Sequence, residues 1–256
     1  MNIKTLIDNN TTDKDQGHCY AEIYDIIFEE IQFTAQNILE IGIDRGGSIL
    51  LWKNYFSNAN IYGIDCNQEA CINPEVLEHL RTDDRVVLLT GLNAYDSLAL
   101  QMVDAISTRN FKKPNPKFDV IIDDGPHTLY SQKKFIQLYA SLLSENGILV
   151  IEDIQDINYL NDLVEVVPDE LKPFVQVYDL RDAINQYDDV LFVINKLSSM
   201  SVSYIYNGMI TPMSSGKWIH GKWHHFIPTQ YVKPVHPNEY ALEEVKEWAQ
   251  RKNPYN

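Results

Sequence analysis

The sequence predicts an α/β fold in which helices cover both faces of a mostly parallel sheet of seven strands. Two observations support this prediction. Short apolar runs typical of buried strands alternate with helical patterns along most of the chain. Five successive strands are then followed by glycine or by acidic residues. In parallel sheets the ligand binds beyond the carboxyl ends of the strands, so this edge is the expected site.

The elements follow one another after a polar lead-in of residues 1–17, which we expect to be mobile or docked on a partner. An amphipathic helix is predicted over 20–31 from apolar residues at helical spacing. Strands are expected at 37–43, 60–65, 85–90, 118–125, 148–153, 174–178 and 189–194. Helices are expected over 49–56, 74–81, up to about 107, and 129–143, the last one stopping at Asn146-Gly147.

The net charge argues against several classes of partner. The chain has 36 acidic and 21 basic residues, which gives a formal charge of −15 and opposes binding to nucleic acid or to an anionic membrane. No apolar run is long enough to span a bilayer, and the N-terminus lacks the apolar core of a signal peptide. The odd set Cys19, Cys66 and Cys71 is typical of reduced thiols, so we expect a cytoplasmic protein.

The first glycine turn, LEIGIDRGGS at 39–48, indicates the type of nucleotide. Asp44 stands where a dinucleotide site needs its second glycine, and its carboxylate would repel a pyrophosphate. Glu40 adds a second acid two residues before Gly42. S-adenosylmethionine fits better, because it has no phosphate and carries a sulfonium and an ammonium group. Asp65, after the second strand, can accept hydrogen bonds from the ribose of either cofactor.

A cluster of acids follows the fourth and fifth strands. The string DDGPH occupies 123–127, and Glu152-Asp153 follows the next strand. Neighbouring strands lie about 4.8 Å apart, so these acids can converge. Their mutual repulsion would be relieved by a divalent cation such as Mg²⁺, Mn²⁺ or Ca²⁺, which prefers oxygen ligands. His127 could then remove a proton from a hydroxyl bound there.

Four strings carry a resemblance to a known family: TTDKDQGHCYAEIY (11–24), LEIGIDRGGSILLWKNYFSNANIYGID (39–65), FDVIIDDGPHTLYSQKKFIQLYASLLSENGILVIEDI (118–154) and YDDVLFVINK (187–196). In them the chain resembles the metal-dependent sugar O-methyltransferases of macrolide and rhamnosyl pathways, of the macrocin and mycinamicin type, a family also labelled with cephalosporin hydroxylases. These are class I S-adenosylmethionine-dependent methyltransferases, and the resemblance implies their Rossmann-like three-layer sandwich.

The resemblance also implies roles for individual residues. The metal ligands would be Asp124, Glu152 and Asp153, and His127 would be the general base. Contacts to the methyl donor would come from Glu40, Gly42, Asp65, Asn93 and Asp123. His18 and Tyr20 of the lead-in would close the site. Two positions depart from the family pattern: Pro126 replaces a serine, and Leu92 replaces an acid.

We therefore expect an S-adenosylmethionine-dependent O-methyltransferase that is assisted by Mg²⁺ or Mn²⁺ and acts on a hydroxyl of a sugar or glycoside. The acceptor could belong to a natural product or to a capsular or surface-polysaccharide precursor, including a phosphoryl-type decoration. The resemblance also implies a homo-oligomer. An NAD-dependent oxidoreductase and a non-catalytic nucleotide-binding partner are the alternatives. An NAD-dependent oxidoreductase would need the second glycine of the turn, which this chain lacks. A non-catalytic partner would have lost the acidic cluster, which this chain retains.

Three parts of the chain are expected from this interpretation. Residues 1–36 would form a lead-in and a helix that close the active site. Residues 37–197 would form the donor-binding catalytic core. Residues 198–256 lack further strand and helix repeats, and this extension could serve as a lid or as part of the acceptor pocket.

Overall fold

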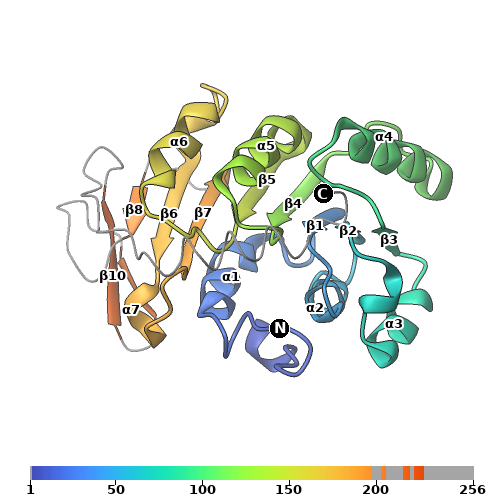
Figure 1. Cartoon of the computed structure of the whole chain (residues 1–256), viewed down its shortest axis with the longest axis horizontal. Helices are drawn as coiled ribbons and strands as arrows, with labels where there is room; N and C mark the ends of the chain where they lie inside the picture. The colour runs from blue at the N-terminus through green and yellow to red at the C-terminus, as the bar shows by residue number, and fades with distance from the viewer. Residues whose placement is uncertain (1, 198–202, 206–215, 220–221, 228–256) are drawn as a thin grey trace, which may run out of the picture.

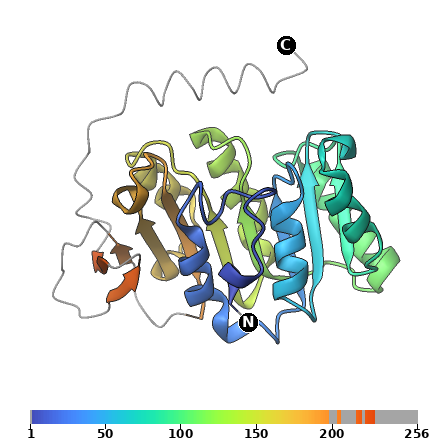
Figure 2. The same cartoon turned by 90° about the horizontal axis from the view of Figure 1, so that it is seen from below.

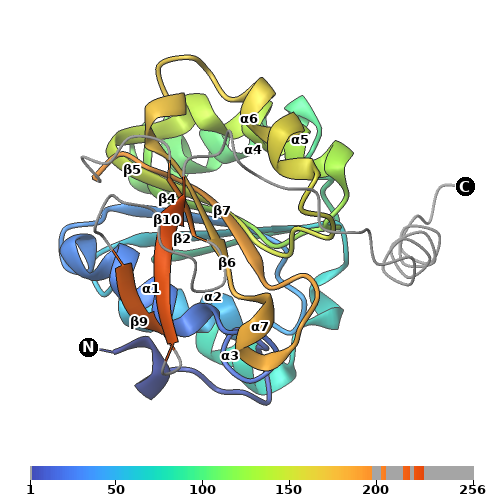
Figure 3. The same ribbon diagram turned by 90° about the vertical axis from the view of Figure 1, so that its left-hand side faces the viewer.

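The computed structural model of the protein describes residues 2–197, 203–205, 216–219 and 222–227. A central sheet is covered by helices on both faces, as the sequence predicts (Figures 1 and 3). One face carries α4 (Ser97–Ile106), α5 (Leu129–Tyr139) and α6 (Tyr159–Val166). The other carries α1 (Tyr20–Phe28), α2 (Gly47–Tyr55), α3 (Pro74–Arg81) and the short α7 (Arg181–Ile184).

The first seven strands lie in the order β3-β2-β1-β4-β5-β7-β6. Their bounds are β1 Asn37–Ile41, β2 Asn60–Asp65, β3 Val86–Thr90, β4 Phe118–Asp123, β5 Leu143–Ile151, β6 Val175–Asp179 and β7 Val190–Asn195. Strands β1 to β5 pair in parallel, and β7 is antiparallel to both of its neighbours. The predicted mostly parallel, Rossmann-like sheet of seven strands is therefore confirmed.

The hydrophobic core lies in two layers, one on each side of the sheet. In β1, Ile38 packs with the residues of α1 and α2, whereas Leu39 and Ile41 pack with those of α4 and α5. Side chains alternate between the faces of a strand, so a strand that is covered on both sides must be apolar at nearly every position. This burial explains the continuous apolar runs by which the strands are recognised in the sequence.

Two details of the predicted elements are wrong. Helix α5 ends at Tyr139, and β5 already begins at Leu143, so the Asn146-Gly147 pair does not stop a helix. Leu143 pairs with Phe118, and the register then shifts so that Ile148 pairs with Val120. The irregular pairing of β4 and β5 accommodates the polar residues 144–147, which are typical of a loop in the sequence. Helices α6 and α7 were not predicted.

The lead-in packs against the rest of its own chain, which corrects the expectation of a mobile or partner-docked segment. The Ile3 side chain is completely buried in the core that contains α1 and α2, and the Ile3 N–H donates to Asp25. Figure 2 shows the lead-in, in the darkest blue, crossing between these two helices. At Gly47 a Cβ would lie 2.4 Å from the carbonyl oxygen of Thr11, so the lead-in lies directly on the start of α2.

The described parts of the predicted extension form β8 (Ser203–Ile205), β10 (Lys222–Ile227) and β9 (Gly216–Ile219), which continue the sheet beyond β6. A role as lid or acceptor pocket concerns residues that lie largely outside the described ones, and it stays a prediction. Within the described part of the chain, no helix combines the length and apolar character that a bilayer crossing requires.

Candidate active site

A cavity of about 440 Å³ lies at the carboxyl ends of β1, β4 and β5. Its walls come from the lead-in (residues 9–13), the glycine turn (42–45), Ser48, and the residues Asp124, Gly125, His127 and Asp153. The volume is within the range of small-molecule sites. The cavity therefore joins the glycine turn and part of the acidic cluster, as the positions of these residues at the strand ends predict.

The glycine turn is held in place by two close contacts. Gly42 has a φ of +93°, and a Cβ at this position would lie 1.9 Å from the carbonyl oxygen of Asp124. One carboxylate oxygen of Asp65 accepts hydrogen bonds from the N–H groups of Ile43 and Asp44, at 2.8 and 3.1 Å. Only glycine allows the turn after β1 to approach the turn after β4 this closely.

Three cavity residues have a left-handed backbone conformation although they are not glycine. The φ angles of Asp44, His127 and Asp153 are +43°, +54° and +54°. Such residues are uncommon, and they are enriched at functional sites, where the surrounding structure enforces the strain. The concentration of three of them around one cavity supports its assignment as the site.

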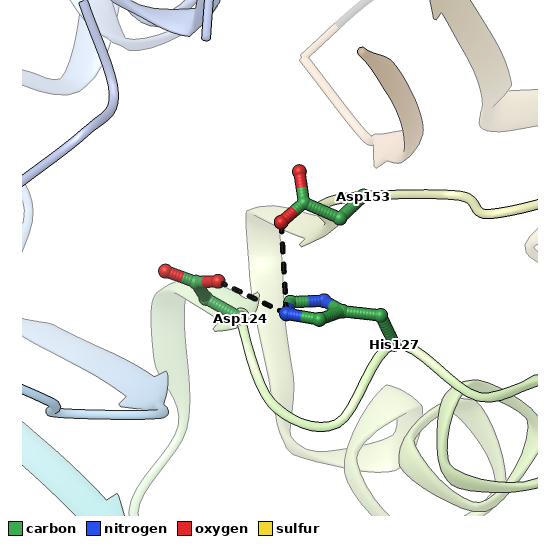
Figure 4. Close-up of side chains that lie close together, drawn as sticks. All are labelled: Asp124, His127 and Asp153. Atoms are coloured by element: carbon green, nitrogen blue, oxygen red, sulfur yellow. Dashed lines mark ion pairs between the residues drawn. The ribbon is translucent and has the colours of Figure 1, made fainter. Parts of the chain in front are cut away.

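Asp124, His127 and Asp153 form a group at the cavity wall, which we name the outer group (Figure 4). The Nε2 atom of His127 lies 3.9 Å from Oδ1 of Asp124 and 3.6 Å from Oδ2 of Asp153. One ligand atom from each residue lies within 4.8 Å of those of the other two. A metal ion could be held here, and a histidine lies beside its two acids.

Glu40, Asp124 and Glu152 form a second group of acids, which we name the inner group. The ammonium of Lys14 lies among them, 2.6 Å from Oδ2 of Asp124 and 2.8 and 2.7 Å from the two oxygens of Glu152. It is also 3.5 Å from Glu40. The hydroxyl of Tyr24 donates a further hydrogen bond to Glu152. Asp124 is thus shared by the two groups.

His18 and Tyr20, which were predicted to close the site, contact Asp153. The Tyr20 hydroxyl donates to Oδ1 of Asp153 at 2.5 Å. Nδ1 of His18 lies 2.6 Å from Asp189 and 3.5 Å from the same Asp153 oxygen. Neither residue is among those that line the cavity, and both contact Asp153 of the cavity wall, so their role in closing the site stays a prediction.

Burial and neighbouring charges shift the pKa values of these acids. Burial raises the pKa of Glu152 well above its usual value, that of Glu40 to about 7, and that of Asp153 to about 6. For Asp124 burial acts in the same direction, but Lys14 and His127 outweigh it and lower the pKa. Burial would lower the pKa of Lys14, and the surrounding carboxylates reverse this shift. The site holds more buried carboxyl groups than its own cations neutralise, which favours binding of a further cation.

The residues predicted to bind the donor lie in two different environments. Gly42 lines the cavity directly. Glu40 is completely buried and reaches the cavity through Ser48, whose hydroxyl donates to Glu40 at 2.7 Å. Asp65 supports the glycine turn from behind. The structure therefore places Asp65 as a support of the turn and Glu40 against Ser48 in the first turn of α2.

Asn93 and Asp123 also lie outside the cavity lining. Asn93 is exposed, and its side chain accepts from the Tyr95 N–H at 3.0 Å. Asp123 is buried, accepts from the Tyr95 hydroxyl at 2.5 Å, and has a pKa that burial raises to about 7. A Cβ at Gly125 would lie 2.0 Å from that same hydroxyl. Tyr95 thus links the loop after β3 to the acidic turn after β4.

Sequence reasoning missed Lys14, Tyr24 and Tyr95. Lys14 and Tyr24 stand in the lead-in string that carries the family resemblance, which is the one signal that could have indicated them. Nothing in their local spacing connects them with acids more than a hundred residues away. From residue type alone, Lys14 could equally be an exposed surface lysine, and Tyr24 and Tyr95 could be ordinary core residues.

Comparison with known proteins agrees with this geometry. Residues 39–154 match the family described as "Methyltransferase domain". A rhamnosyl-tetracenomycin-C 3'-O-methyltransferase of Streptomyces olivaceus is 26% identical over 144 residues, which cover 54% of this chain and 32% of that protein. Mycinamicin VI 2''-O-methyltransferase of Micromonospora griseorubida is 27% identical over 145 residues, covering 53% and 31%. The matched region thus spans about a third of these curated relatives.

A solved structure has the same fold. The MycE methyltransferase of the mycinamycin pathway, in complex with Mg, SAH and mycinamycin VI, superposes with a TM-score of 0.55 at 20% identity. The superposition covers 76% of this chain and 53% of MycE. The predicted resemblance is confirmed: residues 39–154 match a methyltransferase domain, about half of the chain is similar in sequence to curated sugar O-methyltransferases, and the fold is that of MycE.

Proposed function

We propose that the protein is an S-adenosylmethionine-dependent, divalent-metal-assisted O-methyltransferase that acts on a hydroxyl of a sugar or glycoside. The observation that carries this proposal is the outer group: two carboxylates and a histidine meet at the wall of a cavity whose other wall is the glycine turn. The arrangement brings a proton acceptor and a cation-binding pair of acids beside the segment expected to bind the methyl donor.

The donor would bind along the glycine turn. Gly42 lines the cavity and lets the glycine turn lie against the turn after β4, and the carboxylate of Asp44 at the cavity wall suits a cationic sulfonium or ammonium. Asp65, which accepts hydrogen bonds from the turn, together with Asn93 and Asp123, would contact the adenosine and methionine portions. The match of residues 39–154 to a methyltransferase domain supports this placement.

The oxygens of Asp124 and Asp153 would hold the divalent cation, for which Mg²⁺ or Mn²⁺ fits an oxygen-rich donor set. When bound, such a cation lowers the pKa of a coordinated hydroxyl. Glu152, the third ligand that the resemblance implies, is held by Lys14 in this structure.

His127 would act as the general base. Its Nε2 atom faces Asp124 and Asp153 and would take the proton of the acceptor hydroxyl. The acceptor oxygen then forms a bond to the methyl carbon while the bond from that carbon to sulfur breaks, which leaves S-adenosylhomocysteine. The two acids would stabilise the imidazolium that results.

The acceptor class rests on the relatives. Those compared are named for transfer to hydroxyls of rhamnosyl-tetracenomycin and mycinamicin VI, which are glycosides. A small sugar substrate, from a natural product or from a surface-polysaccharide precursor, matches the size of the cavity. A homo-oligomeric, cytoplasmic protein stays the expectation.

Calorimetric titration of the purified protein with S-adenosylhomocysteine and with NAD tests the donor. We expect binding of the first and none of the second. Transfer of labelled methyl groups to a panel of sugars, nucleotide sugars and glycosides, with Mg²⁺ or with EDTA, then tests the reaction. Binding of NAD alone, or full turnover in EDTA, would overturn the corresponding part of the proposal.

A further inference from the structure

Lys14 has no part in the proposed methyl transfer, yet its position is unusual. Its side chain is completely buried, and its ammonium lies within 2.8 Å of carboxylates that follow two different strands. Lysine is almost never fully buried unless it is paired. Removal of an ammonium from water requires close and well-oriented partners, and Asp124 and Glu152 supply them.

We infer that Lys14 is a positioning residue, which fixes the orientation of Asp124 and fastens the lead-in over the cavity; this inference rests on the proposed function. Asp124 uses its two oxygens differently. Oδ2 lies 2.6 Å from the Lys14 ammonium, and Oδ1 is the oxygen directed toward His127. The ammonium therefore selects which oxygen of Asp124 remains available to a bound cation.

Asp153 is held in a similar manner by the start of α1. Its Oδ1 accepts from the Tyr20 hydroxyl, whereas Oδ2 is the oxygen near His127. Each acid of the outer group thus has one oxygen held by Lys14 or Tyr20 and one directed toward the histidine. These two residues act as an outer shell for the acids, and such shells orient ligands and tune their affinity for metal.

The backbone of Lys14 connects this anchor to the cavity wall. Its carbonyl oxygen accepts from the N–H groups of Tyr20 and Ala21, at 3.1 and 3.0 Å, so Lys14 lies beside the start of α1. The residues directly before it, 9–13, line the cavity. Because the ammonium is bound to Asp124 and Glu152, the wall formed by residues 9–13 is attached to the sheet through Lys14.

The inference gives Glu152 a different partner from the one that the resemblance implies. Both of its oxygens lie within 2.8 Å of the Lys14 ammonium, and Tyr24 donates to it as well. Its side chain is 2% exposed and does not line the cavity. Glu152 is therefore the counter-ion of Lys14, and the cation site consists of Asp124 and Asp153, the two acids of the outer group.

Hydrogen exchange on the full chain, free of metal and donor, tests the anchor. In Lys14→Met we expect amides of residues 9–21 to exchange about tenfold faster or more than in the wild type. Titration calorimetry with Mg²⁺ should show an affinity about tenfold lower or more. Lys4→Met is the matched control, because Lys4 lies in the same segment and pairs with Glu22 at 2.7 Å but is 36% exposed. It should leave both readouts unchanged.

Wild-type exchange protection together with wild-type Mg²⁺ affinity in Lys14→Met would overturn the inference. If Lys14→Met does not fold, Lys14→Met/Glu152→Gln removes the buried ammonium together with the carboxylate that it pairs with through two oxygens and restores folding, while residues 9–21 stay unprotected. Wild-type protection in that double variant would equally overturn it. Exchange is measured without metal or donor, so absence of methyl transfer would contradict the proposed function and leave this result standing.

Discussion

The inner and outer groups share Asp124 and yet differ in every other respect. The inner acids are buried around an ammonium that the chain itself supplies. The outer acids border a cavity and face a histidine that is 22% exposed. A cation fixed by the chain cannot be exchanged, whereas an accessible site can exchange its occupant. The comparison separates the structural part of the acidic cluster from the part available for chemistry.

The backbone shows the same difference. Glu40 of the inner group lies within β1, and Glu152 directly follows β5. In the outer group, His127 and Asp153 have left-handed φ angles. Such a conformation costs on the order of 1–3 kcal/mol per residue and persists where the surroundings enforce it. Asp44, His127 and Asp153 at the cavity thus carry this strain, whereas the inner acids Glu40 and Glu152 do not.

The largest expected effect of a substitution concerns His127. Asparagine tolerates a left-handed backbone, so His127→Asn removes the base without adding strain. Turnover should fall by about 10²–10⁴, the usual contribution of a general base, while the unfolding free energy changes little. Initial rates of methyl transfer and urea unfolding measure the two quantities. His79→Asn, on an exposed part of α3, is the control, and an equal rate for both variants would refute the role of His127.

The next largest effect is expected from a substitution at Gly42, where the glycine turn contacts the turn after β4. In Gly42→Ala the new Cβ would lie 1.9 Å from the carbonyl oxygen of Asp124, at a φ of +93°. Strain and overpacking together should lower the unfolding free energy by about 2–5 kcal/mol. Binding of S-adenosylhomocysteine should weaken in parallel. Wild-type stability and donor affinity would show that the two turns can separate freely.

Tyr24 and Tyr20 lie one helical turn apart on α1 and provide a matched pair. Tyr24→Phe removes the hydrogen bond to Glu152 of the inner group, and Tyr20→Phe removes the one to Asp153 of the outer group. Each should lower the unfolding free energy by about 1.5–3 kcal/mol, as for hydrogen bonds to charged groups. Only Tyr20→Phe should weaken Mg²⁺ binding, by about tenfold. Equal metal affinities in calorimetry would contradict the division into two groups.

The smallest effect concerns Ser48, which connects the buried Glu40 to the cavity. Ser48→Ala removes a hydrogen bond of 2.7 Å and should lower the unfolding free energy by about 1 kcal/mol. Chemical denaturation measures this loss. The Mg²⁺ affinity should stay at the wild-type value, because Glu40 belongs to the inner group. A loss of Mg²⁺ binding would place Glu40 in the metal site.

Local patterns in the sequence predicted the sheet and the convergence of the acids that follow β4 and β5, but not their division into two groups. A buried strand between two helical layers is apolar along its length, and the residues after parallel strands meet at one edge. Asp124, His127 and Asp153 could therefore be brought together without coordinates. The end of α5 was mispredicted, because the irregular pairing at the start of β5 depends on β4.

The inner group could not be predicted in this way. Lys14 contacts Asp124 and Glu152, which lie 110 and 138 residues further along the chain. The spacing of residues in the sequence does not indicate contacts over such separations. The polarity of residues 1–17 indicated exposure, but pairing allows a charged side chain to be buried. The same limit applies to Tyr95 and Asp123, whose hydrogen bond joins the loop after β3 to the end of β4.

Titration calorimetry with Mg²⁺ on the wild type, Asp153→Asn and Glu152→Gln tests the central claim most directly. If the outer group holds the cation, Asp153→Asn should lower the affinity by more than about 100-fold, beyond the effect of most outer-shell substitutions. Glu152→Gln should retain binding within about tenfold, because Glu152 pairs with Lys14. The reverse result, with binding lost in Glu152→Gln and kept in Asp153→Asn, would contradict the assignment of the two groups.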